Sequence, residues 1–461
     1  MFAPEIYRSR RLVLRENMGS GLLVFMGHVD APRTYADNAY PFRQDSSFLY
    51  YFGHAQPHLA GVIDADTGHE WLFGPNPTMD ETIWTGPRPG IQELAERVGV
   101  QRGQDMAVLG VLLERAHHKG TPIHFLPPYR EEMRLALHRL LGTGCEPVAL
   151  KASRPLINAV IAQRSLKSEW EIAEIEAALE ISAAMYGHAF ASARPGRREQ
   201  EIAGMIEGEV LTRGSRLSFQ SIVTVHGEVL HNHLADQILK KGDLLLIDSG
   251  AESSNGYASD ITRTLPVGGQ FSSVQRDIYS IVLAAQQEAI RMLRPGVMFK
   301  DVHLAAARVM VTGLCNMGIM RGDVDEAVAC GAHALFFVHG LGHMLGLDVH
   351  DMESFGEDRV GYDASVTRSP QFGLHALRLA REVVPGFVVT VEPGLYFIPG
   401  LIESWRRQGR CTAYINYDVL ASMLPLGGIR IEDDVQIMAT GARVLGPSIP
   451  KTVSEIEACM A

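Results

Sequence analysis

One stretch of the sequence, Leu244–Thr264, constrains the fold more strongly than any other. It reads LLLIDSGAESSNGYASDITRT, in which an apolar run ends at Asp248, a turn-prone segment follows, and a second run carries Asp260. Asn-Gly between two strand-like runs is a strong hairpin signal, so we expect two adjacent strands. Two carboxylates buried side by side are costly unless a cation or a shared proton compensates them. The stretch therefore predicts a functional pair of acids.

Length and composition limit the classes of protein to consider. A chain of 461 residues exceeds the size at which a single core stops growing, which favours two domains. The formal net charge of −11 argues against a nucleic-acid-binding surface. We find no secretory signal pattern and no apolar run of the roughly 20 residues that span a bilayer. Five scattered cysteines without CxxC spacing, Cys145 among them, are typical of reduced thiols. We expect a cytoplasmic protein without nucleic-acid or membrane partners.

The pattern of apolar residues divides the chain into two parts. Strand-like and helix-like segments alternate over the first 150 residues, which predicts an α/β domain that we place at residues 1–155. The second part, residues 156–461, begins with a long amphipathic helix over 168–192, where Ser168 and Glu171 have the spacing of a capping box. Three more helix-like segments follow it, and the rest of this part is strand-rich.

Four later segments carry histidines and carboxylates. They are VHGEVLHNH with His231, FFVHGLGHMLGLDVHD with His339, His343 and His350, VVTVEPGLY with Glu392, and GGIRIEDDV with Arg430 and Glu432. Two of the histidines have the i, i+4 spacing of helical zinc ligands. Glycines at 340 and 342 argue against a regular helix there, so we reject a helical zinc site.

Taken singly, each of these acids or imidazoles could be structural; taken together, they form a metal-ligand set. Four carboxylates and one imidazole without a thiolate suit Mn²⁺, Mg²⁺ or Co²⁺, and Zn²⁺ less selectively. Two divalent cations would neutralise the four carboxylates. Two such ions about 3.5–4 Å apart lower the pKa of a water between them and clamp the reacting oxygens. The set is Asp248, Asp260, His343, Glu392 and Glu432.

These segments, in this order, resemble the metallopeptidase family with the pita-bread fold, which includes methionine aminopeptidase, aminopeptidase P and prolidase. The segments ADNAYPFRQDSSFLYYFG and IWTGPRPG also resemble the N-domain of aminopeptidase P and prolidase, which methionine aminopeptidases generally lack. The resemblance implies an α/β N-terminal domain followed by an α+β pita-bread catalytic domain. It also implies assembly into a homodimer or homotetramer.

The resemblance assigns a role to each matching residue. Asp248 would bind one metal, Asp260 and Glu432 would bridge both, and His343 and Glu392 would bind the second. The cofactor implied is a pair of divalent ions, with Mn²⁺ expected and Co²⁺ or Zn²⁺ as alternatives. His231, His339 and His350 would stabilise the oxyanion, and Glu392 would lie near the proton transfers. Arg430 would position a proton-shuttling carboxylate or bind a substrate carboxylate. Tyr396, Trp84 and Asp37 would contact substrate.

The activity implied is hydrolysis of the bond before proline in peptides with proline at the second position. We favour an Xaa-Pro aminopeptidase. The alternative is an Xaa-Pro dipeptidase (prolidase), because the insert between Glu392 and Glu432 resembles prolidases. We also expect the arginine-rich segment 405–410 of that insert to lie near the site mouth. Two rivals remain, a catalytically dead pita-bread binding module and a creatinase-like hydrolase without metal, and the intact ligand set disfavours both.

Overall fold

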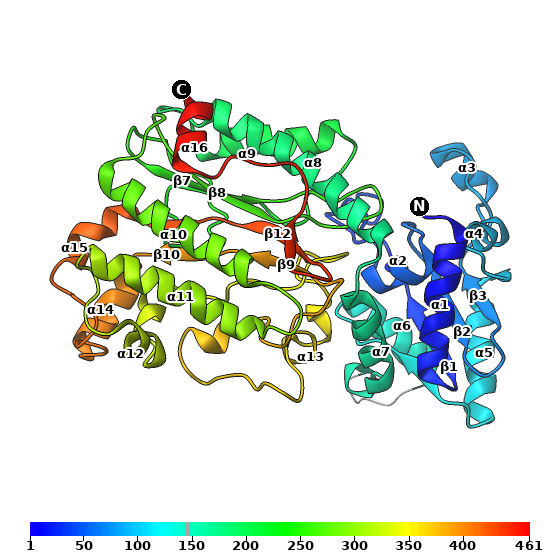
Figure 1. The fold of residues 1–461 in the computed structure, drawn as a ribbon. Coiled ribbons are helices and arrows are strands. Elements are labelled where there is room, and N and C mark those ends of the chain that lie inside the picture. The colour runs from blue at the N-terminus through cyan, green and yellow to red at the C-terminus, as the bar shows by residue number, and fades with distance from the viewer. Residues whose placement is uncertain (143–147) are drawn as a thin grey trace. The chain divides into compact units, whose positions relative to one another are not determined.

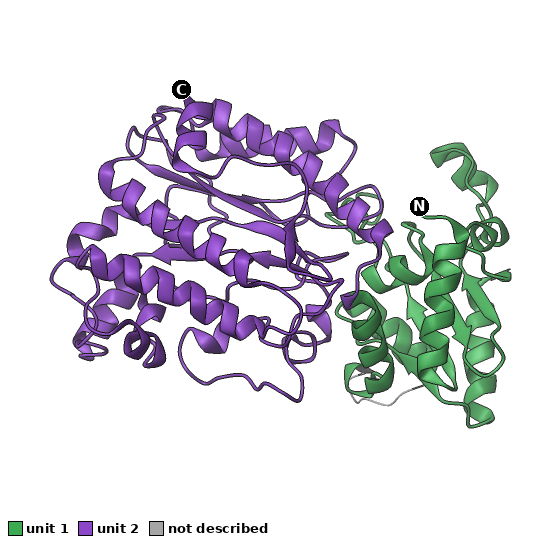
Figure 2. Cartoon of the chain, viewed as in Figure 1, with its two compact units in different colours: residues 1–164 green, residues 165–461 purple. Residues whose placement is uncertain are grey.

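The computed structural model describes residues 1–142 and 148–461, and it forms two compact units (Figure 2). Unit 1 spans Met1–Arg164 and unit 2 spans Ser165–Ala461. Helix α7 (Arg154–Ser165) covers the interval between this boundary and the earlier one that we expected from the sequence. Cys145 lies outside the described residues, and the four other cysteines are free thiols.

Unit 1 is an α/β domain, as the sequence predicted. Its sheet has the strand order β4-β3-β2-β1-β5, with an antiparallel centre and a parallel strand at each edge. The strands are β1 (Leu22–Met26), β2 (Ala60–Asp64), β3 (Glu70–Phe73), β4 (Arg102–Gln104) and β5 (Ile123–Phe125). The helices are α1 (Pro4–Met18), α2 (Ser46–Phe52), α3 (Met79–Thr85), α4 (Ile91–Arg97), α5 (Met106–His118), α6 (Glu131–Leu141) and α7. Val24, Val62 and Phe73 of the sheet pack with Leu109 and Leu113 of α5 in its core.

Unit 2 combines small sheets with long helices that lie along the strands (Figure 1). The strands form three sheets in the orders β6-β7-β8, β13-β12-β9 and β10-β11. They are β6 (Ile222–Thr224), β7 (Leu244–Ser249), β8 (Ile261–Pro266), β9 (Val388–Val391), β10 (Gly394–Tyr396), β11 (Gly428–Arg430), β12 (Asp433–Ile437) and β13 (Ala442–Val444). The long helices are α8 (Glu169–Ser192), α9 (Glu199–Thr212), α10 (Ser273–Met292) and α11 (Phe299–Asn316).

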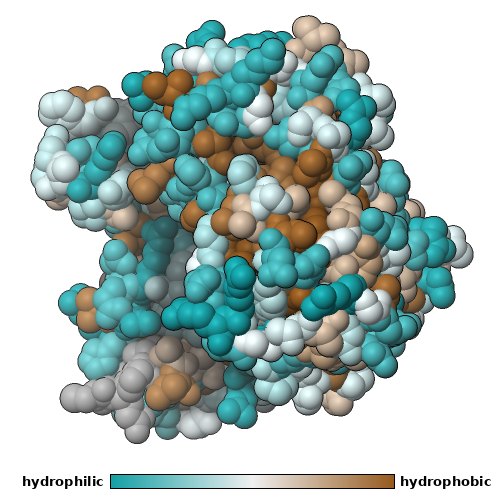
Figure 3. Space-filling model, turned by 90° about the vertical axis from the view of Figure 1, so that its left-hand side faces the viewer, coloured by the Kyte–Doolittle hydropathy of each residue, from teal (hydrophilic) through white to brown (hydrophobic). Residues whose placement is uncertain are grey.

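Shorter helices complete unit 2. They are α12 (Val324–Ala329), α13 (Glu357–Val360), α14 (Pro399–Arg407), α15 (Leu420–Met423) and α16 (Val453–Met460). Short 3-10 turns cover Val148–Lys151, Ala332–Leu335, Glu353–Phe355, Leu374–Ala376 and Leu424–Leu426. In the view of Figure 3, hydrophobic residues gather around a hollow near the middle, and hydrophilic residues cover most of the rest. None of the helices in the described parts of the chain is both long and apolar enough to cross a bilayer.

The hairpin predicted from the sequence is confirmed. Strands β7 and β8 are antiparallel, and Asp248 is paired with Thr262 across them. Every residue of both strands is buried, and Gly256 turns the connection with φ +83°, a value that side chains rarely adopt. The capping box is confirmed as well, because the Ser168 backbone N–H donates to Glu171 Oε2 (3.0 Å).

A buried ion pair ties the start of α8 to the loop that carries His350. Lys167 Nζ lies 2.9 Å from Asp351 Oδ2, and both side chains are 1% exposed. The Asp351 backbone N–H donates to the Met344 carbonyl oxygen (2.9 Å), which closes the loop on itself. Breaking a buried pair is far costlier than breaking an exposed one, because the remaining charge stays in a medium of low dielectric constant.

We expect Lys167→Met to lower the free energy of unfolding of unit 2 by about 3–5 kcal/mol, since a buried carboxylate loses this counter-charge. The control is Arg308→Ala, which removes the exposed pair of Arg308 with Asp325 (2.6 Å) and should cost no more than about 1 kcal/mol. Urea denaturation followed by circular dichroism measures both. Equal losses in the two variants would contradict the expectation.

Candidate metal centre

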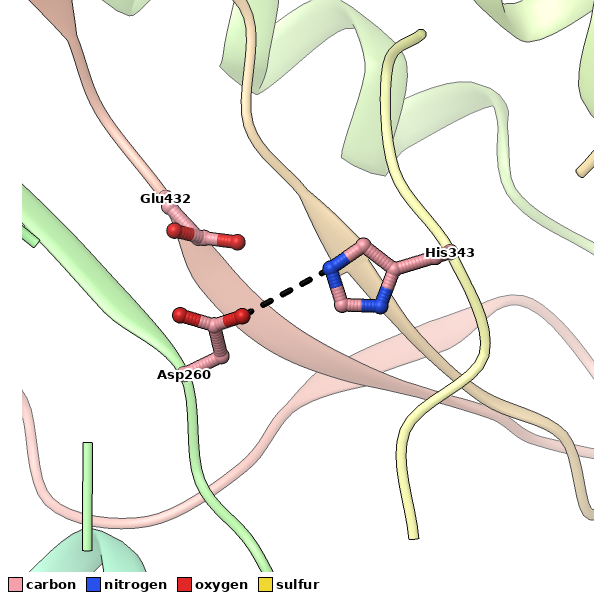
Figure 4. A group of neighbouring side chains, drawn as sticks. All are labelled: Asp260, His343 and Glu432. Carbon is pink, nitrogen blue, oxygen red and sulfur yellow. Dashed lines mark ion pairs between the residues drawn. The ribbon is translucent and has the colours of Figure 1, made fainter. Parts of the chain in front are cut away.

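Four carboxylates and one imidazole come together where strands of unit 2 begin or end. Asp248 lies near the end of β7, and Asp260 directly precedes β8. Glu392 directly follows β9, and Glu432 lies between β11 and β12. Figure 4 shows Asp260, His343 and Glu432 pointing toward one another, and their ligand atoms lie within 4.8 Å of each other. Five residues that are far apart in the sequence thus reach one region of unit 2.

His343 lies in an irregular segment, as the neighbouring glycines predicted. A Cβ on Gly342 would lie 2.0 Å from the Thr390 carbonyl oxygen, so the close approach of these segments requires glycine. The His343 backbone N–H donates to Thr390 Oγ1 (3.1 Å), and its Nδ1 lies 3.1 Å from the Met344 carbonyl oxygen. With Nδ1 engaged in this way, Nε2 faces Asp260 Oδ2 at 3.5 Å. The imidazole is therefore oriented as a metal ligand is, with its other nitrogen bound to the backbone.

The buried carboxylates of the site repel one another and would be stabilised by cations. Burial raises the pKa of Asp260 and Glu432 well above the ordinary carboxylate value, and repulsion between neighbouring carboxylates adds to the shift. Burial likewise raises the pKa of Glu392. Among the described residues, Oδ1 of Asp248 and Oδ1 of Asp260 are buried without a hydrogen-bond partner. Hard oxygen ligands left open in this way fit divalent cations.

Arg430 connects two of these acids to their surroundings. Its side chain is 4% exposed, and it donates to Asp248 Oδ2 (2.5 Å), Thr262 Oγ1 (3.1 Å) and the Tyr396 hydroxyl (2.9 Å). The Thr262 hydroxyl in turn donates to Glu432 Oε2 (2.7 Å). A fixed guanidinium thus holds one carboxylate directly and another through a hydroxyl, which limits the rotamers that either acid can adopt.

His339 is neutral and engaged on both ring nitrogens. Burial, assisted by the Arg430 charge, lowers the pKa of His339 to about 3, and burial raises that of Tyr396 to about 12. Nδ1 of His339 lies 2.7 Å from the Gly340 carbonyl oxygen, and Nε2 lies 2.8 Å from the Tyr396 hydroxyl. A neutral ring that donates from Nδ1 accepts at Nε2, so the tyrosine donates to His339 and accepts from Arg430. This hydrogen-bond chain positions Arg430.

A cavity of about 390 Å³ opens over the acids. Its volume is that of a small-ligand site, and its walls combine charged groups with apolar side chains. The five predicted metal ligands line it together with His231, His339, His350 and Arg430. Apolar contacts come from Phe219, Ile222, Leu230 and Val349. The structure thus brings together all nine residues that the sequence placed at the metals or in catalysis.

The three residues predicted to contact substrate are not among those that line this cavity. Tyr396 is fully buried behind the cavity wall, where it bonds to His339 and Arg430. Asp37 and Trp84 belong to unit 1 and are exposed, Trp84 by 83%. The arginine-rich segment 405–410 does not line the cavity; the guanidinium of its last residue stacks on the Trp405 ring, 3.8 Å from the ring centroid. Residues 405–407 form the end of α14, and Gln408 is its C-cap.

Arg378 lines the cavity but was missed by the sequence analysis. It lies in the tract HALRLAR, which has no catalytic spacing and no glycine-rich turn of the kind that marked the other segments. Its guanidinium bonds to Glu353 and, at 2.9 Å, to Glu357. The sequence showed only that Arg378 lies in the long segment before Glu392. That position does not predict where its side chain points.

Comparison with known proteins agrees with this geometry. Residues 173–439 match metallopeptidase family M24, and residues 7–124 match the aminopeptidase P N-terminal domain. The Xaa-Pro aminopeptidase of Escherichia coli (strain K12) is 34% identical over 470 residues, covering 98% of this chain and 97% of that protein. The Xaa-Pro dipeptidase of Homo sapiens is 32% identical over 460 residues, covering 97% and 91%.

Solved structures show the same similarity. The structure of Escherichia coli aminopeptidase P with the inhibitor Pro-Leu has a TM-score of 0.81 and 32% identity, covering 100% of this chain and 98% of that one. A zinc-substituted form of that enzyme in complex with product matches with the same TM-score, identity and coverage. The likeness extends over both units, so it is not confined to the residues around the cavity.

The raised carboxylate pKa values predict how metal and pH act on stability. Without metal, the folded state keeps protons that the unfolded chain releases above about pH 4, so stability should fall as the pH rises from there. Metal binding requires the deprotonated acids, so the gain in melting temperature on adding Mn²⁺ should be larger at pH 8 than at pH 6. Thermal unfolding with Mn²⁺ or with a chelator measures it.

The matched variant is Glu432→Gln, which removes one of the repelling charges. It should melt higher than the unaltered chain in chelator and should lose most of the gain on adding Mn²⁺. An equal gain at both pH values, or a variant that keeps the full gain, would count against metal binding by these acids.

Proposed function

The chain belongs to metallopeptidase family M24, and on this basis we propose that it is a metal-dependent Xaa-Pro aminopeptidase, which releases the N-terminal residue of peptides whose second residue is proline. The observation that carries the proposal is the convergence of Asp248, Asp260, His343, Glu392 and Glu432 in one cavity. The similarity to a relative named Xaa-Pro aminopeptidase over nearly the whole length of both chains supports the same activity.

We propose that the five ligands hold two divalent ions, with Mn²⁺ as the ion used in the cell. Asp248 would bind one, His343 and Glu392 the other, and Asp260 and Glu432 both. When bound, the ions polarise the substrate carbonyl and activate a water molecule for attack. Two divalent ions carry as much positive charge as the four carboxylates carry negative charge, which supports this number of ions.

The side chains around the acids would orient the peptide and move protons. His231 and His350 line the cavity, and each would hydrogen-bond the carbonyl oxygen as negative charge develops on it. Glu392 lines the cavity with 18% of its side chain exposed, a position from which it would carry a proton to the leaving nitrogen. Proline presents a tertiary amide without an N–H, so its ring is recognised by shape, and Phe219 and Ile222 supply an apolar surface.

We further propose that the protein acts as a homodimer or homotetramer in the cytoplasm. Helix α3 buries none of its residues, and Met79, Ile83 and Trp84 on it are 75%, 72% and 83% exposed. Clustered exposed apolar side chains of this size are typical of an interface. A second copy of the chain is the partner we propose, and Trp84 and Asp37 would contact substrate in that assembly.

One observation favours a second candidate, an Xaa-Pro dipeptidase. Arg378 lines the cavity with 32% of its side chain exposed, and a guanidinium binds carboxylates in a planar, two-pronged manner. A dipeptide has a free carboxylate next to its proline, whereas a longer peptide has an amide there. The relative named Xaa-Pro dipeptidase supports this alternative.

A peptide panel tests the activity. Chelator-treated protein should be inactive, and Mn²⁺ should restore cleavage of Gly-Pro-Gly-Gly after its first glycine, because the acids need their counter-ions to organise the site. Gly-Pro alone should be cleaved much more slowly. Gly-Ala-Gly-Gly controls for proline specificity. Rapid cleavage of only the dipeptide would favour the dipeptidase over the aminopeptidase. Cleavage of neither proline peptide would contradict both proposals.

Arg378→Gln distinguishes the two candidates independently. For an aminopeptidase, the ratio of kcat/KM on Gly-Pro to that on Gly-Pro-Gly-Gly should stay within about threefold, because Arg378 would then not bind the free carboxylate of the dipeptide. For a dipeptidase, loss of a charge-assisted pair worth about 1.5–3 kcal/mol should lower the ratio by roughly 10- to 100-fold. Steady-state kinetics on both peptides measures the ratio, which cancels any general loss of activity.

A further inference from the structure

The chain makes a tight turn directly after His350. Met352 has φ +64° and is fully buried, a conformation that costs non-glycine residues about 1–2 kcal/mol. Glu353 begins a short 3-10 turn at this point, and its backbone N–H donates to the His350 carbonyl oxygen (3.3 Å). Strained backbone of this kind persists where the surrounding structure imposes it, and it clusters at functional sites.

The turn brings a carboxylate back to the imidazole that precedes it. Glu353 Oε2 lies 3.3 Å from His350 Nδ1, and the glutamate side chain is 14% exposed. The same oxygen bonds to the Arg378 guanidinium. Burial alone would raise the pKa of Glu353, but the bond to His350 and the nearby positive charges hold it below its ordinary value. Glu353 is therefore an ionised acceptor.

His350 faces the metal centre on its other side. Its ring lines the cavity, and its centroid lies 4.2 Å from that of His343. An imidazole whose Nδ1–H is bound by a carboxylate has its tautomer and ring orientation fixed, and Nε2 is then the nitrogen left for substrate. In the neutral ring Nε2 only accepts, so it donates to a carbonyl oxygen in the imidazolium, whose charge the Glu353 carboxylate offsets.

We propose that Glu353 is a positioning residue for the peptidase reaction: its carboxylate accepts the Nδ1–H of His350 and fixes the ring so that Nε2 faces the substrate carbonyl, while Arg378 holds the carboxylate in place. The inference rests on the proposed function for its reaction, but the hydrogen bond itself can be measured without any substrate. Neither Glu353 nor its contact with His350 is signalled by a motif in the sequence.

The chain offers a matched control next to this residue. Glu357 bonds to the same Arg378 nitrogen (2.9 Å) but has no contact with His350 among the described ion pairs and hydrogen bonds. Its side chain is 39% exposed. A role that came only from neutralising Arg378 would be shared by Glu353 and Glu357, whereas positioning of His350 belongs to Glu353 alone.

Kinetics on Gly-Pro-Gly-Gly test the role in the reaction. Glu353→Ala should lower kcat by about 10- to 100-fold with KM within about threefold, a range typical of residues that orient a functional histidine. Glu353→Gln keeps an acceptor oxygen and should recover most of the loss. Glu357→Ala should stay within about twofold of the unaltered enzyme. In a His350→Ala background, Glu353→Ala should change kcat by less than about twofold, because the ring to be positioned is gone.

Nuclear magnetic resonance of zinc-loaded protein with ¹⁵N-labelled imidazole rings tests the bond itself. The His350 signals, assigned by their loss in His350→Ala, should show a protonated Nδ1, and they should shift in Glu353→Ala but not in Glu357→Ala. Unshifted signals in Glu353→Ala overturn the proposal, as does an equal kinetic loss in the His350→Ala background. If the unaltered enzyme cleaves no Xaa-Pro peptide, the proposed function fails while the resonance result still decides on the hydrogen bond.

Discussion

Repulsion between buried carboxylates is the constraint on which the site depends. Asp248, Asp260, Glu392 and Glu432 line one small cavity, and burial raises the pKa of three of them. Such a cluster is stable only when its charges are compensated by protons or cations. Arg430 compensates part of the charge from within the protein through its bond to Asp248. The remaining negative charge defines a binding site for divalent ions. The repulsion that destabilises the metal-free protein therefore also supplies the affinity for metal.

Rigid strands make this arrangement possible. The acids lie at strand ends rather than in long loops, and the backbone hydrogen bonds of β7 with β8 and of β9 with β12 fix their spacing. The long helices along the strands bury the opposite side of the sheets (Figure 1). A site built on sheets keeps its ligands close together even when the charges favour separation.

The sequence predicted the parts of the site that have local signals. Asp248 and Asp260 were found because Asn-Gly marks a hairpin, and His343 was assigned because its segment resembles a motif of the family. The roles of Tyr396 and Arg378 could not be predicted in this way. Tyr396 bonds to His339 and Arg430, both far from it in the chain, and Arg378 reaches the cavity from a tract of irregular turns. Contacts of this kind depend on how separate segments pack, which no local pattern records.

Two ion pairs flank His350 and differ in exposure. On one side Asp351 pairs with Lys167, and both side chains are 1% exposed. On the other side Glu353 pairs with Arg378, which is 32% exposed and lines the cavity. The buried pair fixes the loop, because losing either charge leaves the other in a medium of low dielectric constant. The second pair is partly exposed and adjoins the cavity, so its charges are accessible to a bound molecule. The two pairs thus separate the charges that hold the loop in place from the charges that face the cavity.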